Sequence, residues 1–336
     1  MTGAAPTAQP SGRDPNRGLD LLRATEAAAI AAGRWLGSGN RNGALSSSEE
    51  MMAKALAATQ WDARIVIGSE AEASHLRAGT HIGAGQERLD LVVVPVDGIS
   101  LIARGVGQAL SIAAVTGPGA VPAIPPVAYM HKIAVGPDAV GSIDVSDSAE
   151  NNLRRVAFAK NRGVADLTVI MLDRPRHQAL IEEVRQLGAR ISLISDGDVG
   201  AALMAAWEST GIDVFIGSGG AREAVVGACA VRCMGGEMQC RPWIRNAEEE
   251  DAVRAGGWDL DCVLKMDALA PSSDVSVAVT GVSGAGILRG VVYHGDWYES
   301  HSMVMRSRTG TVREVVSRHH IGQRQSTRPR QEHRRS

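Results

Sequence analysis

The sequence predicts an α/β protein built from stacked layers of sheet and helix, and two observations point to this class. Residues 167–234 repeat the order strand, loop, helix three times, which is typical of a doubly wound, largely parallel sheet. Hydrophobic residues make up 44% of the chain but aromatic residues only 3%, so the core must consist mainly of alanine, valine, isoleucine and leucine. With 38 glycines available for tight turns, this composition suits buried strands that alternate with helices.

The N-terminal part of the chain predicts two helices followed by strands. An apolar stripe with helical spacing predicts a helix over Leu19–Trp35, and a second helix with an acidic first turn is expected over Ser47–Leu56. Arg64–Ile67 is a short predicted strand. Leu89–Val96 is a nearly unbroken aliphatic run, which predicts a central strand buried on both faces and a turn at Asp97.

The same hydrophobic patterns predict three strand, loop, helix units in the middle of the chain and several strands in its C-terminal part. The units have strands at Leu167–Leu172, Ile191–Ile194 and Ile212–Ile216, followed by helices at His177–Gln186, Val199–Trp207 and Arg222–Met234. After Pro271 the pattern changes to short strands, which predict a mixed or antiparallel extension of the sheets. These strands are Val275–Thr280, Ile287–Tyr293, Ser302–Arg306 and Thr311–Val316.

Charge and composition argue against several function classes. The chain carries 35 basic and 37 acidic side chains, a net charge of −2, whereas nucleic-acid binders have a basic surplus. No uncharged apolar run is long enough to span a membrane, and the N-terminus lacks the apolar core of a signal peptide. The cysteines form no C-x-x-C pair, so we expect reduced thiols in a cytoplasmic protein. Cys229 and Cys233, one helical turn apart, are expected in the core.

Both ends of the chain have the composition of disordered segments. Residues 1–16 form a leader rich in Pro, Thr, Ser, Gly and Ala, and residues 323–336 form an arginine-rich tail. The tail is interpreted as a solubilising end, with a weak polyanion contact as the alternative. Between them we expect two halves, residues 17–160 and residues 161–322.

Polar clusters follow the predicted strands, where ligands of open α/β sheets bind. They are Asp97-Gly98, Arg174-Pro175-Arg176-His177, Asp196-Gly197-Asp198 and the glycine-rich run 217–220 before Glu223. Two guanidinium groups beside a glycine-rich helix N-terminus predict a phosphate site. The neighbouring carboxylates suit sugar hydroxyls or a metal ion.

Each cluster also has a plainer interpretation. Arg174 and Arg176 could be surface charges, and Asp196 and Asp198 could cap the helix that follows them. The glycine-rich run could be a tight turn. It is not a dinucleotide-binding fingerprint, because Arg222 stands where that motif needs its third glycine.

With these clusters in this order, the chain resembles the class II fructose-1,6-bisphosphatases, the lithium-sensitive, metal-dependent sugar phosphatases of bacteria. The resemblance runs from about Arg17 to Val316. The matching segments are Ala31–Trp35, Tyr129–Pro137, Leu172–His177, Leu193–Val199, Gly235–Glu237 and His301–Arg306. The resemblance implies a layered α/β/α/β/α sugar-phosphatase fold, a homodimer or homotetramer, and hydrolysis of the 1-phosphate of fructose 1,6-bisphosphate with Mg²⁺ or Mn²⁺.

The resemblance also assigns roles to residues, with the metal on the side of residues 17–160 and the substrate on the side of residues 161–322. Asp97 and Ser100 stand at catalytic positions. The substrate contacts of the family match Asp97, Gly98, Tyr129, Arg174, Arg176, Asp196, Gly197, Asp198 and Gly220. The sugar-phosphate side is therefore expected to be intact.

The metal side departs from the family pattern. Of five expected carboxylate ligands, only Asp97 and Glu223 are present. The other three ligand positions carry Asn40, Ser69 and Val94. In addition, Leu45 replaces a further Asp of the family pattern, and Ile99 replaces a Thr. Asparagine offers a carbonyl oxygen without charge, serine is short and neutral, and valine has no ligand atom. Glu70 or Glu72 could fill the position of Ser69 if the alignment shifts. We expect weak binding of divalent ions, because even losses in the shell around metal ligands lower affinity or activity about 10–100-fold.

Three functions remain open at this point. The first is a phosphatase of phosphorylated sugars whose metal site is reduced or rearranged. The second is a catalytically inactive sugar-phosphate binder that regulates an active paralogue or pairs with it in a hetero-oligomer. The third is a phosphatase for another sugar phosphate in a specialised pathway.

Overall fold

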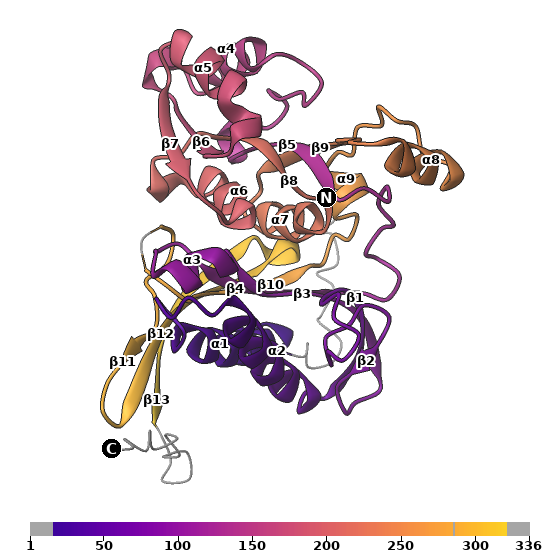
Figure 1. The fold of residues 1–336 in the computed structure, drawn as a ribbon, viewed down its shortest axis with the longest axis vertical. Helices are drawn as coiled ribbons and strands as arrows, with labels where there is room; N and C mark the ends of the chain where they lie inside the picture. Colours follow the sequence, from indigo (N-terminus) through magenta and orange to yellow (C-terminus); the bar gives the residue numbers. More distant parts are fainter. Residues whose placement is uncertain (1–15, 285, 321–336) are drawn as a thin grey trace, which may run out of the picture.

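Two β-sheets with helices on both sides of each make up the protein (Figure 1). The computed structural model describes residues 16–284 and 286–320. The predicted tail, and the predicted leader apart from Asn16, lie outside these residues. Among the described helices, none combines the length and the hydropathy that crossing a membrane requires.

The first sheet takes strands from both ends of the chain and has the order β11-β12-β10-β4-β3-β1-β2, with β13 paired to β12. Its strands are β1 (Trp61–Ile67), β2 (His81–Ile82), β3 (Glu87–Asp97), β4 (Leu110–Thr116), β10 (Ser276–Gly281), β11 (Val292–Tyr293), β12 (Trp297–Arg306) and β13 (Thr311–His320). The neighbours β1 and β3 are parallel, and the other pairs of the described sheet are antiparallel. The antiparallel extension predicted after Pro271 is confirmed.

The second sheet comes from the middle of the chain and has the order β7-β6-β8-β5-β9. Its strands are β5 (Tyr129–Val135), β6 (Thr168–Leu172), β7 (Arg190–Ile194), β8 (Val214–Gly220) and β9 (Glu237–Pro242). The strands β6, β7 and β8 are parallel, as predicted, whereas β5 pairs antiparallel with both β8 and β9. The side chains at the carboxyl ends of β6, β7 and β8 therefore lie at one edge of the sheet.

Helices cover both sheets and fill the space between them (Figure 1). They are α1 (Arg17–Gly33), α2 (Arg41–Ala57), α3 (Ile99–Arg104), α4 (Ala149–Ala159), α5 (Gln178–Gln186), α6 (Asp198–Ala206), α7 (Ala221–Cys233), α8 (Ala247–Ala255) and α9 (Met266–Leu269). Helices α1 and α2 pack on the outer face of the first sheet, α4 and α5 on the outer face of the second. With α6 and α7 between the sheets, the layers run α/β/α/β/α, which confirms the predicted fold class.

Small side chains make the central layer possible. Every residue of α6 is buried, and α7 exposes little more than Arg222, Glu223 and Arg232. Alanine, glycine and valine dominate both helices, so two sheets can approach them from opposite sides without leaving voids. Cys229 and Cys233 are buried in this layer, which confirms that they pack in the core.

Two differences from the sequence prediction have simple causes. Helix α2 begins at Arg41 and not at Ser47, because the amide oxygen of Asn40 accepts a hydrogen bond from the Gly43 backbone at 2.9 Å and caps the helix early. The strand β5 was not predicted, because Lys132 interrupts its apolar run with a charge. The division of the chain into halves at residue 160 stays a prediction.

A bidentate ion pair ties the first sheet together at one end. Arg306 of β12 donates from Nε and Nη2 to the two carboxylate oxygens of Asp274, both at 2.7 Å. These hydrogen bonds hold the pKa of Asp274 below its usual value. The stability that the pair contributes is present above the unfolded-state pKa of about 3.9 and is lost as the pH falls through the lower, folded-state pKa.

Replacing Asp274 with asparagine should therefore destabilise the protein in a pH-dependent way. We expect Asp274→Asn to lower the free energy of unfolding by about 1 kcal/mol at pH 7, a modest figure because solvent screens part of the pair. The loss should be smaller at pH 3 than at pH 7, because it shrinks as the pH falls from about 3.9 toward the lower, folded-state pKa. Urea denaturation at both pH values measures it, with Asp251→Asn on exposed α8 as the control. A loss of equal size at pH 3 and pH 7 would contradict the role of the charge.

Candidate functional site

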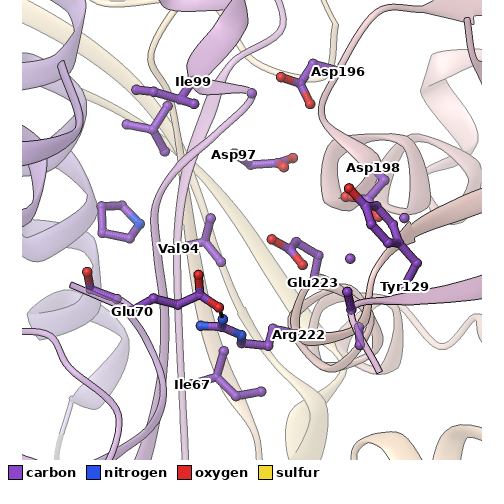
Figure 2. A pocket seen from close by; sticks show the side chains of 18 of the residues that line it. Ile67, Glu70, Val94, Asp97, Ile99, Tyr129, Asp196, Asp198, Arg222 and Glu223 are labelled. Carbon is purple, nitrogen blue, oxygen red and sulfur yellow. Dashed lines mark ion pairs between the residues drawn. The ribbon is translucent and has the colours of Figure 1, made fainter. Parts of the chain in front are cut away.

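A cavity of about 950 Å³ opens at the edge where several strands end. The ends of β1, β3, β6 and β8 contribute to its lining, together with the beginnings of β5 and α7. Figure 2 shows side chains from both sheets pointing into it. The position agrees with the rule that ligands of α/β sheets bind beyond the carboxyl ends of the strands.

Among the described residues, six carboxylates line this cavity, namely Glu49, Glu70, Asp97, Asp196, Asp198 and Glu223, and Figure 2 labels all of them except Glu49. Asp97 ends β3, is buried, and accepts a hydrogen bond from the Gly200 backbone at 3.1 Å. Burial raises the pKa of Asp97 well above its usual value, and the nearby charge of Asp198 raises it further. The crowding of carboxyl groups around Asp97 therefore disfavours its charged form.

A lysine inside the sheet balances part of this charge. Lys132 of β5 is 2% exposed, and its Nζ donates to Asp198 at 2.5 Å and to the carbonyl oxygen of Gly220 at 2.7 Å. Burial alone would lower the pKa of Lys132, but Asp198 and other nearby acidic groups raise it, so that the net shift is upward. Gly219 leaves room for the pair, because a Cβ atom there would lie 1.8 Å from the Asp198 carboxylate. Asp198 is thus held in one position.

The arginine turn after β6 lies on the same cavity. Arg176 donates to the carbonyl oxygen of Ser218 at 2.8 Å, and its guanidinium lies 5.3 Å from the ring centre of Tyr129 and 5.9 Å from that of Trp243. Burial lowers the pKa of Arg176, but an arginine stays protonated in proteins. Arg174 lies 3.8 Å from the carboxylate of Asp196. The structure therefore brings the predicted phosphate-side residues Tyr129, Arg174 and Arg176 together.

The loop after β7 is shaped by glycine and not by helix capping. Gly197, with φ of 90°, precedes α6, and no side chain caps this helix. Asp196 instead accepts a hydrogen bond from the hydroxyl of Ser100, and Asp198 pairs with Lys132. Gly98 also has a positive φ, 82°, where β3 turns into α3. The alternative that Asp196 and Asp198 merely cap the helix is therefore wrong.

The predicted metal-side residues are engaged elsewhere or lack donor atoms. The amide oxygen of Asn40 caps α2, and the hydroxyl of Ser69 accepts from the Ala71 backbone at 3.2 Å. Val94 lines the cavity with a hydrocarbon side chain. Glu70 forms an ion pair with Arg222, and Glu72 is exposed. Glu70 lines the cavity and Glu72 does not, so a substitute ligand role for Glu70 stays a prediction.

The donor set does not fit a pair of divalent ions. Asp97 and Glu223 are the predicted carboxylate ligands that line the cavity. Within residues 16–284 and 286–320, no group of three His, Cys, Asp or Glu side chains has an arrangement that could hold a metal ion.

Comparison with known proteins identifies the family. The model of a family described as bacterial fructose-1,6-bisphosphatase, glpX-encoded, matches residues 15–319. The chain belongs to this family.

Full-length relatives agree with this assignment. The class 2 fructose-1,6-bisphosphatase of Haemophilus influenzae is 34% identical over 319 residues, covering 90% of this chain and 96% of the relative. The fructose-1,6-bisphosphatase 1 class 2 of Escherichia coli is 34% identical, with 90% and 95% covered. A Synechococcus relative named D-fructose 1,6-bisphosphatase class 2/sedoheptulose 1,7-bisphosphatase is 33% identical, with 91% and 96% covered. The resemblance found in the sequence is confirmed.

Sequence reasoning missed several residues that shape this bisphosphatase-family site. Lys132 and Arg222 line or support the cavity, and Trp243 packs on Tyr129 with ring centres 5.9 Å apart. A signal existed for Lys132, because a lone lysine in an apolar strand is expected to have a buried partner. No comparable signal exists for Arg222 or Trp243, whose partners come from distant parts of the chain.

Removing Lys132 should destabilise the fold strongly. Lys132→Met leaves the Asp198 carboxylate buried without a partner, and we expect a loss of about 3–5 kcal/mol of unfolding free energy in urea denaturation. Lys54→Met is the matched control, because Lys54 pairs with Glu50 on the exposed face of α2. This substitution should lower the free energy of unfolding by at most about 1 kcal/mol. The double variant Lys132→Met with Asp198→Leu should recover most of the loss. Equal losses for Lys132→Met and Lys54→Met would contradict this account.

Proposed function

We propose that this chain binds a phosphorylated sugar in the cavity between the two sheets. The observation that carries the proposal is the set of Arg174, Arg176 and Tyr129 on the same cavity as the carboxylates of Asp97, Asp196 and Asp198. Guanidinium groups suit a phosphate, and carboxylates suit sugar hydroxyls. The relatives named above make fructose 1,6-bisphosphate the first ligand to test and sedoheptulose 1,7-bisphosphate the second.

The arginine side favours binding because it is already ordered. Arg176 is held by the Ser218 carbonyl and by the rings of Tyr129 and Trp243, so little side-chain freedom remains to be lost when a phosphate arrives. Gly220 has no side chain, and the Glu223 carboxylate takes the space instead, since a Cβ atom there would lie 1.9 Å from it. The site thus has an ordered cation at Arg176.

A second candidate is a phosphatase with a reduced metal site. The observation in its favour is that Asp97, Asp198 and Glu223 all line the cavity (Figure 2). Mg²⁺ or Mn²⁺ is the ion that the family resemblance implies. A substrate other than fructose 1,6-bisphosphate, homo-oligomer formation and pairing with an active paralogue are further proposals that are compatible with either candidate.

Sugar-phosphate binding should not require a metal ion. In calorimetry with EDTA, the wild type should bind fructose 1,6-bisphosphate, and Arg176→Gln should weaken binding about tenfold to hundredfold, because a hydrogen bond to a charged group contributes about 1.5–3 kcal/mol. Arg254→Gln on α8, where Arg254 pairs with Glu250, is the control and should bind as the wild type does. Absence of wild-type binding at millimolar ligand would refute the proposal.

Phosphate release decides between the two candidates. With fructose 1,6-bisphosphate and Mn²⁺, the first candidate predicts that the wild type releases phosphate no faster than a protein-free control. The triple variant Asn40→Asp, Ser69→Glu, Val94→Asp, which restores three carboxylates, should release it at least about tenfold faster than the wild type. Circular dichroism checks that the variant is folded. Fast release by the wild type, unchanged in the triple variant, would favour the second candidate and would show that other residues hold the ion.

A further inference from the structure

An arginine points into the cavity where two expected metal ligands are missing. Arg222 is the second residue of α7, and it lines the cavity together with Ser69 and Val94. Figure 2 shows it well separated from Tyr129, which marks the Arg174 and Arg176 side of the cavity. The cavity is therefore lined by arginines from several elements: Arg41 of α2, Arg174 and Arg176 after β6, and Arg222 of α7.

The contacts of Arg222 hold its guanidinium at the cavity but leave it accessible. One nitrogen, Nη2, forms an ion pair with Glu70, and the other, Nη1, donates to the carbonyl oxygen of Gly68 at 3.3 Å. The Arg222 side chain is 39% exposed and that of Glu70 is 78% exposed. An ion pair this open to solvent contributes about 0–1 kcal/mol, so another anion can replace Glu70 at low cost.

The loss of carboxylates changes what this part of the cavity attracts. Glutamate or aspartate at positions 69 and 94 would draw a divalent cation, but Ser69 and Val94 are neutral, and the charged side chains that line the cavity with them include Arg222, paired with Glu70. A phosphate monoester carries about −1.5 to −2 charges near neutral pH. A guanidinium can bind its oxygens through two parallel hydrogen bonds.

We propose that Arg222 binds the second phosphate of a sugar bisphosphate directly, in the place of a divalent cation, and that Glu70 occupies Arg222 when no ligand is bound. This inference rests on the proposed function, in which Arg174 and Arg176 bind the first phosphate. Glu70 is then an internal competitor of the ligand. Changes at Arg222 and Glu70 should act on affinity in opposite directions.

Calorimetry in EDTA with two ligands tests the proposal. Fructose 1,6-bisphosphate carries both phosphates, and fructose 6-phosphate carries one. Arg222→Gln should weaken binding of the bisphosphate about tenfold or more and leave the monophosphate within about twofold, because only the second phosphate loses its partner. Glu70→Gln should strengthen bisphosphate binding about two- to fivefold by removing the competing anion. Arg222→Lys, which keeps the charge, should lose less affinity than Arg222→Gln.

Arg254→Gln on α8 is the charge-matched control, and thermal unfolding verifies that each variant is folded. Bisphosphate affinity that is unchanged in Arg222→Gln, or an equal loss for both ligands, would overturn the role of Arg222 while leaving the proposed function intact. Replacing EDTA with Mg²⁺ should alter the affinity of the wild type for fructose 1,6-bisphosphate by less than about twofold. A tenfold increase in this affinity would also overturn the role of Arg222. If the wild type binds neither ligand, the proposed function itself is wrong.

Discussion

The two central helices, buried between the sheets, are the constraint on which the rest of the structure depends. Helices α6 and α7 have a sheet on each side, so their residues must be small and apolar for the sheets to pack closely. This requirement explains a hydrophobic fraction of 44% with only 3% aromatic residues. Both helices begin at the cavity, with Asp198 and Ala221, so the same packing that forms the core also positions the polar groups of the site.

Charge balance is the second constraint, and it differs between the two sides of the cavity. On one side, Lys132 neutralises Asp198 inside the protein, and Arg174 lies near Asp196. On the other side, the residues at the expected ligand positions 69 and 94 are neutral, and the pair of Arg222 with Glu70 faces solvent. This distribution is the basis of the proposal that anionic groups bind at both Arg176 and Arg222.

The sequence was sufficient for the layers and for much of the site, because both depend on local patterns. The strand, loop, helix order of residues 167–234 predicted the parallel strands, and the rule for strand ends placed Arg176 and Asp198 near one another. What could not be predicted depends on contacts across the chain. The partner of Lys132 is 66 residues away, and that of Arg222 lies on the loop after β1. The resemblance assigned Asn40 to a ligand position, whereas in the structure its amide oxygen caps α2.

The mixed origin of the first sheet has a consequence for synthesis of the chain on the ribosome. Helix α1 packs on β10 and β12, which come about 250 residues later, whereas the strands of the second sheet all lie within residues 129–242. At translation rates of about 5–20 residues per second, β10 and β12 are synthesised roughly 10–50 s after α1. The middle of the chain can complete its own sheet during that time. The N-terminal helices therefore expose apolar surface in the nascent protein, which is the period in which a chaperone has most to shield.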